Sequence, residues 1–370
     1  MRQFDYRLLK DCSWSTGILS FIAQIYEHKG RQEHYCKERP VELERLSEIA
    51  ISQSIESSNK IEGIETSKAR LRQIVAETVI PHNSDEQEIA GYRDVLKTID
   101  ESYEYIPLTV DIILQLHRDL FRYTDRHFGG KFKDTQNYIT ERHADGRSFV
   151  RFIPLEPFET PSAVQMICAS YRDALANELI NPLILIPVFL CDFLRIHPFN
   201  DGNGRMSRLL TALLLYQSGF YVGRYISLEK KIEQTKDTYY DVLGAVSGGW
   251  HEGENDYTPF IKYFLSILLN SYRDLEDRVG SVDQKITGYE KVRQVADSTL
   301  GKFTKTEVLE RAPSYGSSSV EAALKKLVEE GHIKRIGSGR STAYVRNFFE
   351  REFSVTGTGA SMHRVDGRDE

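Results

Sequence analysis

The sequence predicts a mainly α protein: a helical bundle that carries one small β-hairpin, followed by a separate C-terminal unit of short helices and strands. Three observations support this prediction. Apolar residues recur at helical spacing over most of residues 1–270. An Asp-Gly pair separates two β-rich pieces within that stretch. After about residue 300, short helical patterns give way to strand-like runs around Gly-Ser-Gly.

We expect five regions from these patterns. They are an N-terminal helical region at 1–105 that includes a helix at about 40–63, a catalytic core at 106–270, a helical connector at 271–300, a C-terminal unit at 301–350 and a disordered tail at 351–370. In the first region, Pro40 suits the first turn of a helix. The polar segment from His28 to Pro40 reads as a loop.

Composition narrows the class of protein. The chain has 370 residues, of which 28% are charged and 40% hydrophobic, and its net charge is −6. This balance fits a globular protein without general attraction to nucleic acid or anionic lipid. Its four cysteines show no metal-ligand spacing, and no apolar stretch reaches membrane-spanning length. We therefore expect reduced thiols, no membrane partner and a cytoplasmic location.

The most informative stretch joins two apolar runs, at 186–194 and 209–215. Pro198 disfavours helical geometry at His197, and Gly202 and Gly204 let the backbone turn sharply. This predicts a helix, a tight loop and a second helix that begins near Gly204. The N–H groups at the start of that helix form an anion site.

The side chains around this loop add chemistry to the anion site. Arg205 and Arg208 are three residues apart and share one helix face. Asp201 is an acceptor suited to a hard cation such as Mg²⁺, and His197 can accept a proton near neutral pH. Together they predict a nucleotide-phosphate site with a base beside it.

His-Pro-Phe-x-Asp-Gly-Asn-Gly-Arg-x-x-Arg, at 197–208, resembles the full signature of the Fic family, whose usual activity is protein AMPylation. The resemblance implies transfer of AMP from ATP to a side-chain hydroxyl of a target protein, or of the chain itself. It assigns His197 as base, Phe199 as the core anchor of the nucleotide-binding loop and Asp201 as the Mg²⁺ ligand. It also assigns the phosphates to Gly202, Asn203, Gly204, Arg205 and Arg208.

Two further segments carry the resemblance. Ser58 and Glu62 lie four residues apart before Gly63, in a pattern similar to the inhibitory motif of Fic proteins. On that pattern, Glu62 pairs with Arg208 and distorts ATP binding, while Ser58 supports the contact. The Tyr239-Tyr240 pair is similar to a Fic pattern in which a tyrosine contacts the nucleotide.

The predicted hairpin has an Asp145-Gly146 turn, a strong hairpin signal. The family has a comparable flap that aligns an extended target segment over the active site, which here implies docking at Ile139, Thr140 and Arg142. The chain departs from the family where Lys131 and Lys133 follow Gly130, because an arginine is expected there. This departure leaves the anchoring of the flap open.

The C-terminal unit resembles a winged helix-turn-helix domain, with helices from Thr304 and Ser317 and two strands around Gly337 to Arg340. Residues 302–346 carry nine Lys and Arg against five Glu, so DNA is one candidate partner and protein docking another. Two alternatives to the AMP transferase stay open: a nucleotide-sensing DNA-binding regulator or adaptor, and a Fic protein that removes AMP. A homodimer is also compatible with the sequence.

Overall fold

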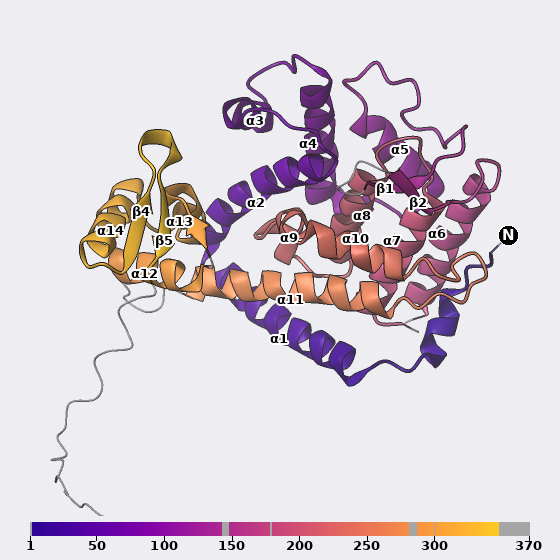
Figure 1. Cartoon of the computed structure of the whole chain (residues 1–370). Helices are drawn as coiled ribbons and strands as arrows, with labels where there is room; N and C mark the ends of the chain where they lie inside the picture. Colours follow the sequence, from indigo (N-terminus) through magenta and orange to yellow (C-terminus); the bar gives the residue numbers. More distant parts are fainter. Residues whose placement is uncertain (1, 143–147, 178–179, 281–286, 300, 348–370) are drawn as a thin grey trace, which may run out of the picture. The chain divides into compact units, whose positions relative to one another are not determined.

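The computed structural model describes residues 2–142, 148–177, 180–280, 287–299 and 301–347 (Figure 1). The chain forms two compact units, Met1–Val279 and Gly280–Glu370. The mainly α prediction is confirmed. The Asp145-Gly146 turn and the predicted tail at 351–370 lie outside the described residues.

Unit 1 is a bundle of helices with one hairpin at its surface. Its helices are α1 (Thr16–Glu38), α2 (Pro40–Ile61), α3 (Lys68–Val75), α4 (Ser84–Ser102), α5 (Val110–Leu120), α6 (Thr160–Ala176), α7 (Pro182–Ile196), α8 (Asn203–Gln217), α9 (Leu228–Gln234), α10 (Lys236–Ala245) and α11 (Thr258–Gly280), with 3₁₀ turns η1 (Tyr6–Asp11), η2 (Tyr103–Tyr105) and η3 (Val222–Arg224). The hairpin pairs β1 (Ile139–Arg142) with β2 (Ser148–Phe152) in antiparallel register.

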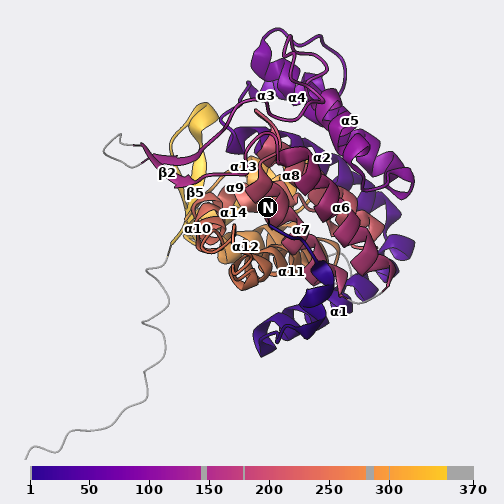
Figure 2. The same ribbon diagram turned by 90° about the vertical axis from the view of Figure 1, so that its right-hand side faces the viewer.

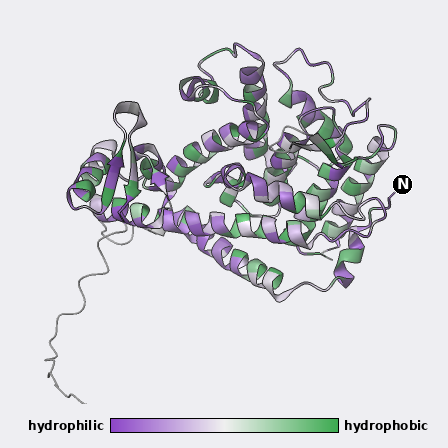
Figure 3. Cartoon of the chain, in the orientation of Figure 1, coloured by the Kyte–Doolittle hydropathy of each residue, from purple (hydrophilic) through white to green (hydrophobic). Residues whose placement is uncertain are grey.

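The predicted loop at His28–Pro40 is wrong, because α1 continues to Glu38. The glutamate, lysine, arginine and glutamine residues of this segment are good helix formers. Most of their side chains are exposed, and Figure 3 shows this half of α1 as largely hydrophilic. Polarity here marks a solvated helix face rather than a break in the helix.

The centre of unit 1 is α7, which packs between α6 and α8 (Figure 2). Every residue from Leu183 to Ile196 is buried, because the helix is apolar on all sides. Asn181 caps its start by accepting a hydrogen bond from the Leu183 N–H. His197 follows the other end of α7, so the loop between α7 and α8 starts from a helix that is buried from Leu183 to Ile196.

One buried carboxylate ties distant segments to α7. Asp192 accepts hydrogen bonds from Tyr6 Oη at 2.9 Å, from Trp250 Nε1 at 2.8 Å and from Tyr257 Oη at 2.8 Å. Burial raises its pKa, against the opposing effect of Arg2 and of these donors. The network joins the N-terminal segment and the approach to α11 to the central helix.

The C-terminal unit has its own core. It contains α12 (Gly288–Ser298), β3 (Lys302–Phe303), α13 (Lys305–Arg311), α14 (Ser317–Glu329), β4 (Ile333–Ile336), η4 (Gly339–Ser341) and β5 (Ala343–Arg346). The strands form an antiparallel sheet in the order β3-β5-β4. Its buried residues are Val292, Val295, Ala296, Phe303, Val308, Val320, Ala323, Leu324, Leu327 and Ile333. This order is compatible with a winged helix-turn-helix, which stays a prediction.

The segment expected as a connector at 271–300 is organised differently. Its first part is the end of α11, where Tyr272, Leu275 and Val279 are buried in unit 1. Its last part is α12, which packs on α14 within the C-terminal unit. The apolar residues of both parts are spaced at helical period among charges, so they enter two different cores.

In the described segments, no helix combines the length and apolarity needed to cross a membrane.

We predict that Asp192→Ala lowers the free energy of unfolding by about 3 kcal/mol or more, because it leaves several buried donors without an acceptor. Urea denaturation followed by circular dichroism measures the loss. Asp173→Ala is the matched control, since the Asp173 side chain is 50% exposed and pairs with Arg7 at 3.7 Å. Equal stability of the two variants would contradict a structural role for the Asp192 network.

Candidate active site

The residues singled out from the sequence converge on one cavity of about 700 Å³ in unit 1. It is lined by segments far apart in the chain: the end of α2, the hairpin, the loop between α7 and α8, and α10. Of the predicted site residues, it contains Glu62, Ile139, Thr140, His197, Gly204, Arg208, Tyr239 and Tyr240.

His197 ends α7 in a left-handed conformation, with φ 51°. Its Nδ1 lies 3.2 Å from the carbonyl oxygen of Leu194, which assigns the ring proton to Nδ1 and leaves Nε2 as an acceptor. Burial lowers the pKa of His197 to about 4, although the Leu194 carbonyl opposes this shift. The imidazole is therefore neutral at pH 7 and able to accept a proton.

Lys133 holds the backbone on both sides of His197. Its Nζ donates to the carbonyl of Ile196 at 3.2 Å, and its backbone N–H donates to that of Pro198 at 2.9 Å. Burial lowers the pKa of Lys133 to about 8. Its Nζ also donates to Asn137 Oδ1 at 3.0 Å, two residues before β1, so Lys133 connects the approach to the hairpin with the end of α7. Its role in anchoring the flap stays open.

The loop after His197 is braced by its own side chains. Asn203 accepts a hydrogen bond from the Phe199 N–H at 2.9 Å and donates one to the Phe199 carbonyl at 2.7 Å. The Phe199 ring is fully buried and stacks on His117 at 3.7 Å between centroids. Phe199 is thus a core anchor away from the cavity, and the Asn203 amide is used within the loop. No pattern in the sequence singled out His117.

Close neighbours leave no room for a side chain at Gly202 and Gly204. Gly202 has φ +83°, and a Cβ there would lie 2.9 Å from the Phe121 ring. A Cβ on Gly204 would lie only 2.2 Å from Oε1 of Glu62. The Glu62 carboxylate therefore lies directly over the first turn of α8, where the helix dipole favours an anion.

Arg208 is the cation that holds this carboxylate. Its Nη2 donates to Glu62 Oε1 at 2.7 Å and to the Ser58 carbonyl at 2.9 Å, and its Nε donates to Ser58 Oγ at 2.8 Å. Burial opposes ionisation of Glu62, yet Arg208 outweighs it and keeps the pKa of Glu62 below its usual value. Ser58 and Glu62 thus meet the signature arginine through hydrogen bonds and one ion pair.

Arg205 does not line the cavity, in contrast to the prediction that it binds phosphate. Its side chain is 1% exposed, with Nη1 2.6 Å from Oε2 of Glu88 on α4. The guanidinium also lies over the Phe121 ring, 5.1 Å from the centroid. Only a buried carboxylate from another helix could draw it there, and Glu88 carried no signal in the sequence.

Asp201 is the one signature carboxylate at the exposed side of the loop. Its side chain is 44% exposed, and Oδ1 accepts a hydrogen bond from the Gly202 N–H at 2.6 Å. In the part of the chain that the structure describes, no cluster of three or more His, Cys, Asp or Glu could hold a metal. A single carboxylate still fits Mg²⁺, which in nucleotide sites takes one or two carboxylates and completes its shell with phosphates and water.

The two tyrosines of α10 differ in exposure. Tyr239 is 5% exposed and Tyr240 is 38% exposed, and both line the cavity. Lys236, which the sequence analysis missed, donates to the Ile61 carbonyl at 2.7 Å and places Nζ 5.9 Å from the centre of the Tyr240 ring. α10 therefore contributes an aromatic wall and a cation beside the end of α2.

The hairpin forms another wall. Ile139 and Thr140 of β1 line the cavity, as does Arg151 of β2, which pairs with Asp241 at 3.6 Å. The side chain of Arg142 lies outside the described residues, so its predicted role stays a prediction.

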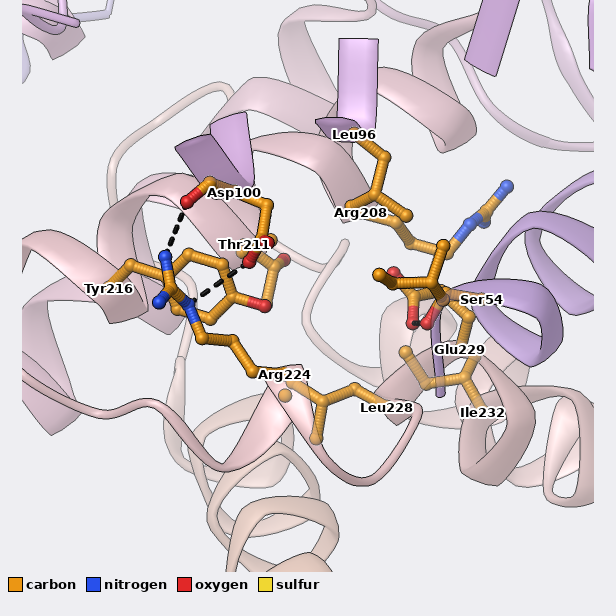
Figure 4. A pocket seen from close by; sticks show the side chains of 13 residues that line it. Ser54, Leu96, Asp100, Arg208, Thr211, Tyr216, Arg224, Leu228, Glu229 and Ile232 are labelled. Atoms are coloured by element: carbon orange, nitrogen blue, oxygen red, sulfur yellow. Dashed lines mark hydrogen bonds and ion pairs between the residues drawn. The ribbon is translucent and has the colours of Figure 1, made fainter. Parts of the chain in front are cut away.

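A second, smaller cavity lies behind Arg208 and shows how α2 is held (Figure 4). Its volume is about 30 Å³, enough for a water molecule. Ser54 and Glu229 lie on one side of it, with Ser54 Oγ donating to Glu229 Oε2 at 2.7 Å. One turn along α2, Ser57 donates to Glu233 at 2.8 Å. Two carboxylates of α9 thus attach α2 to α9.

Residues 107–215 match the sequence model of the Fic/DOC family. The chain is 24% identical over 266 residues to a protein adenylyltransferase Fic of Nematostella vectensis, covering 69% of this chain and 55% of the relative. It is 28% identical over 232 residues to a protein of the same name from Culex quinquefasciatus, covering 60% of this chain and 41% of the relative. It thus spans about half the length of these curated relatives.

Solved structures share the fold. A Fic family protein from Desulfovibrio desulfuricans G20 aligns with a TM-score of 0.58 at 19% identity, over 95% of this chain and 99% of the other. Fic-1 from C. elegans aligns with a TM-score of 0.56 at 22% identity, over 72% and 73% of the two chains. Residues 107–215 are thus similar to the Fic/DOC family, and the chain shares the fold of solved Fic proteins.

Proposed function

We propose that this protein is an autoinhibited AMPylase that transfers AMP from ATP to a Ser, Thr or Tyr hydroxyl of a target protein. The observation that carries the proposal is a neutral His197, with Nε2 as acceptor, in the same cavity as the α8 N-terminus and Arg208. Nucleotidyl transfer depends mainly on positioning and charge stabilisation, so a base beside an anion-binding site meets its main requirements.

In the proposed reaction, His197 Nε2 accepts the proton of the target hydroxyl as its oxygen attacks the α-phosphorus of ATP. A new P–O bond forms to the target, the bond between the α- and β-phosphates breaks, and pyrophosphate leaves. The N–H groups of Gly204 and its neighbours at the α8 N-terminus would stabilise the added charge. The Nδ1 contact to Leu194 keeps the imidazole in the tautomer that this step requires.

Asp201 is the residue we propose for Mg²⁺, which when bound would neutralise phosphate charge. Tyr239 and Tyr240 are proposed to contact the nucleoside, and β1, through Ile139, Thr140 and Arg142, to dock an extended target segment. Arg205 is not proposed as a phosphate ligand in this state, because Glu88 holds it in the core.

Autoinhibition follows from the position of Glu62. Its carboxylate occupies the anion-favouring space over Gly204 and pairs with Arg208. A phosphate in the same space would meet a negative charge and would lack the guanidinium partner. The release signal must therefore separate α2 from Arg208.

For the C-terminal unit, we favour protein docking over DNA binding. Lys305 pairs with Glu321 at 2.7 Å, and Lys325 and Lys326 lie 3.9 Å from Glu329 and Glu330. These pairs reduce the positive field of the α14 face on which DNA recognition would depend.

The alternatives to AMP transfer are a nucleotide-sensing regulator and an AMP-removing enzyme, and both predict no AMP label on protein. We also propose that the protein is located in the cytoplasm and forms a homodimer.

We predict that Glu62→Gly raises AMP transfer at least roughly tenfold, because a charged hydrogen bond worth about 1.5–3 kcal/mol no longer closes the site. Label from α-labelled ATP on protein, with Mg²⁺ and cell extract as a source of targets, measures the effect. Glu65→Gly is the control, since Glu65 lies three residues further along, between α2 and α3, with an exposed side chain. Equal rates in Glu62→Gly and wild type would refute autoinhibition.

His197→Ala in the Glu62→Gly background should lower AMP transfer by about 10²–10⁴-fold, because the target hydroxyl loses its base. ATP binding, measured by calorimetry, should persist. Label that survives the substitution would sink the proposed role of His197.

The pH dependence should follow the depressed pKa of His197. Because that pKa is about 4, the base stays neutral, and kcat/KM in Glu62→Gly should hold as the pH falls from 7 to about 5. The rate should then fall as the pH passes through about 4. Unfolding must be followed in parallel: between the ordinary histidine pKa and 4, the unfolded chain binds a proton that the folded chain does not, so stability declines with falling pH. A loss of kcat/KM centred near pH 6.5 in folded protein would contradict the buried, neutral imidazole.

A further inference from the structure

A buried ion pair connects α4 to the first turn of α8. The Glu88 side chain is 4% exposed, with Oε2 2.6 Å from Nη1 of Arg205. On its other side, Arg205 places Nη2 3.6 Å from Oδ1 of Asp201. One arginine therefore lies between a buried carboxylate and the exposed carboxylate of the loop.

Glu88 and Arg205 are buried, whereas Asp201 is 44% exposed. Arg205 stays ionised even when buried, as guanidinium groups do. In the described part of the chain, its ion pairs are those with Glu88 and Asp201. If Glu88 were neutral, the full positive charge of Arg205 would act on Asp201 and on any cation bound to it.

We propose that Glu88 is a positioning residue for the divalent-cation site: it neutralises Arg205 and so leaves the Asp201 carboxylate available to Mg²⁺. The inference rests on the proposed function, because it takes Asp201 as the ligand of the cation that accompanies ATP. It assigns the buried arginine a role distinct from phosphate binding. Arg205 steers the Asp201 carboxylate, and Glu88 sets how strongly it does so.

The alternative is a purely structural role for the Glu88–Arg205 pair. The Glu88–Arg205 pair also joins α4 to α8, which are in contact, and could serve only to hold the two helices together. A purely structural pair and a charge-balancing pair differ when both partners are neutralised. Neutralising both restores charge balance at Asp201 but does not restore the bridge between the helices.

The test measures the ATP dissociation constant by calorimetry on the full chain, with Mg²⁺ and with EDTA, in the Glu62→Gly background. The ratio of the two constants is the Mg²⁺-dependent gain in affinity. Glu88→Gln should reduce this gain about tenfold, as expected when a partner of a metal ligand is lost, and should change the constant in EDTA much less. Glu88→Gln combined with Arg205→Gln should recover most of the gain.

Arg126→Gln is the matched control. Arg126 contacts the same carboxylate at 3.5 Å but is 45% exposed, so its loss should leave the Mg²⁺-dependent gain unchanged. Thermal unfolding by circular dichroism verifies that each variant is folded. The inference would be overturned if Glu88→Gln weakened ATP binding equally with Mg²⁺ and with EDTA. It would also be overturned if the double variant had no larger Mg²⁺-dependent gain in affinity than Glu88→Gln alone. The absence of a Mg²⁺-dependent gain in Glu62→Gly itself would overturn it as well.

The outcomes separate this inference from the proposed function. If Glu62→Gly binds ATP with a Mg²⁺-dependent gain that Glu88→Gln diminishes, yet no protein is labelled, AMP transfer fails and the role of Glu88 stands. If protein is labelled but Glu88→Gln keeps the full gain, the role of Glu88 fails and AMP transfer stands.

Discussion

The structure of the site depends on how the loop between α7 and α8 is closed. The Asn203 amide bonds both backbone groups of Phe199, while the Phe199 ring is buried against His117. These bonds hold the loop from inside, whereas the first N–H groups of α8 have no side-chain cap and stay available to an anion. His197 and the N-terminus of α8 are thereby held in one cavity, on a central helix whose residues are all buried. Lys133 adds a bond on each side of His197.

Arg208 can pair with Glu62 or with a nucleotide phosphate, so the two compete for it. Arg208 is buried, and a buried guanidinium must find acceptors, which Ser58 and Glu62 supply from α2. Any nucleotide that uses Arg208 has to replace those acceptors with phosphate oxygens. The contact also has a mechanical basis, since Glu229 and Glu233 of α9 hold α2 through Ser54 and Ser57. The position of Glu62 therefore depends both on its ion pair with Arg208 and on the attachment of α2 to α9.

The two signature arginines have separate surroundings although they lie three residues apart. Arg208 opens on the cavity, whereas Arg205 is drawn into the core by Glu88. Burial makes each guanidinium depend on a specific carboxylate, because an unpaired charge in the core is costly. The carboxylates come from different places, the C-terminal end of α2 and the middle of α4, so two arginines of one motif have different partners.

The sequence alone determined the mainly α class, the helix–loop–helix at His197 and the resemblance to the Fic family, since apolar period, proline and glycine positions and a long motif are local signals. It also led to the pairing of Glu62 with Arg208, through resemblance rather than through spacing. It misread the polar second half of α1 as a loop, because polarity alone does not distinguish a loop from a solvated helix. Tertiary structure decided that Arg205 meets Glu88 and that Lys133 bonds both the end of α7 and the approach to the hairpin. The physical reason is that a buried charge takes whichever partner the packing of distant helices brings within reach, and no local pattern records that partner.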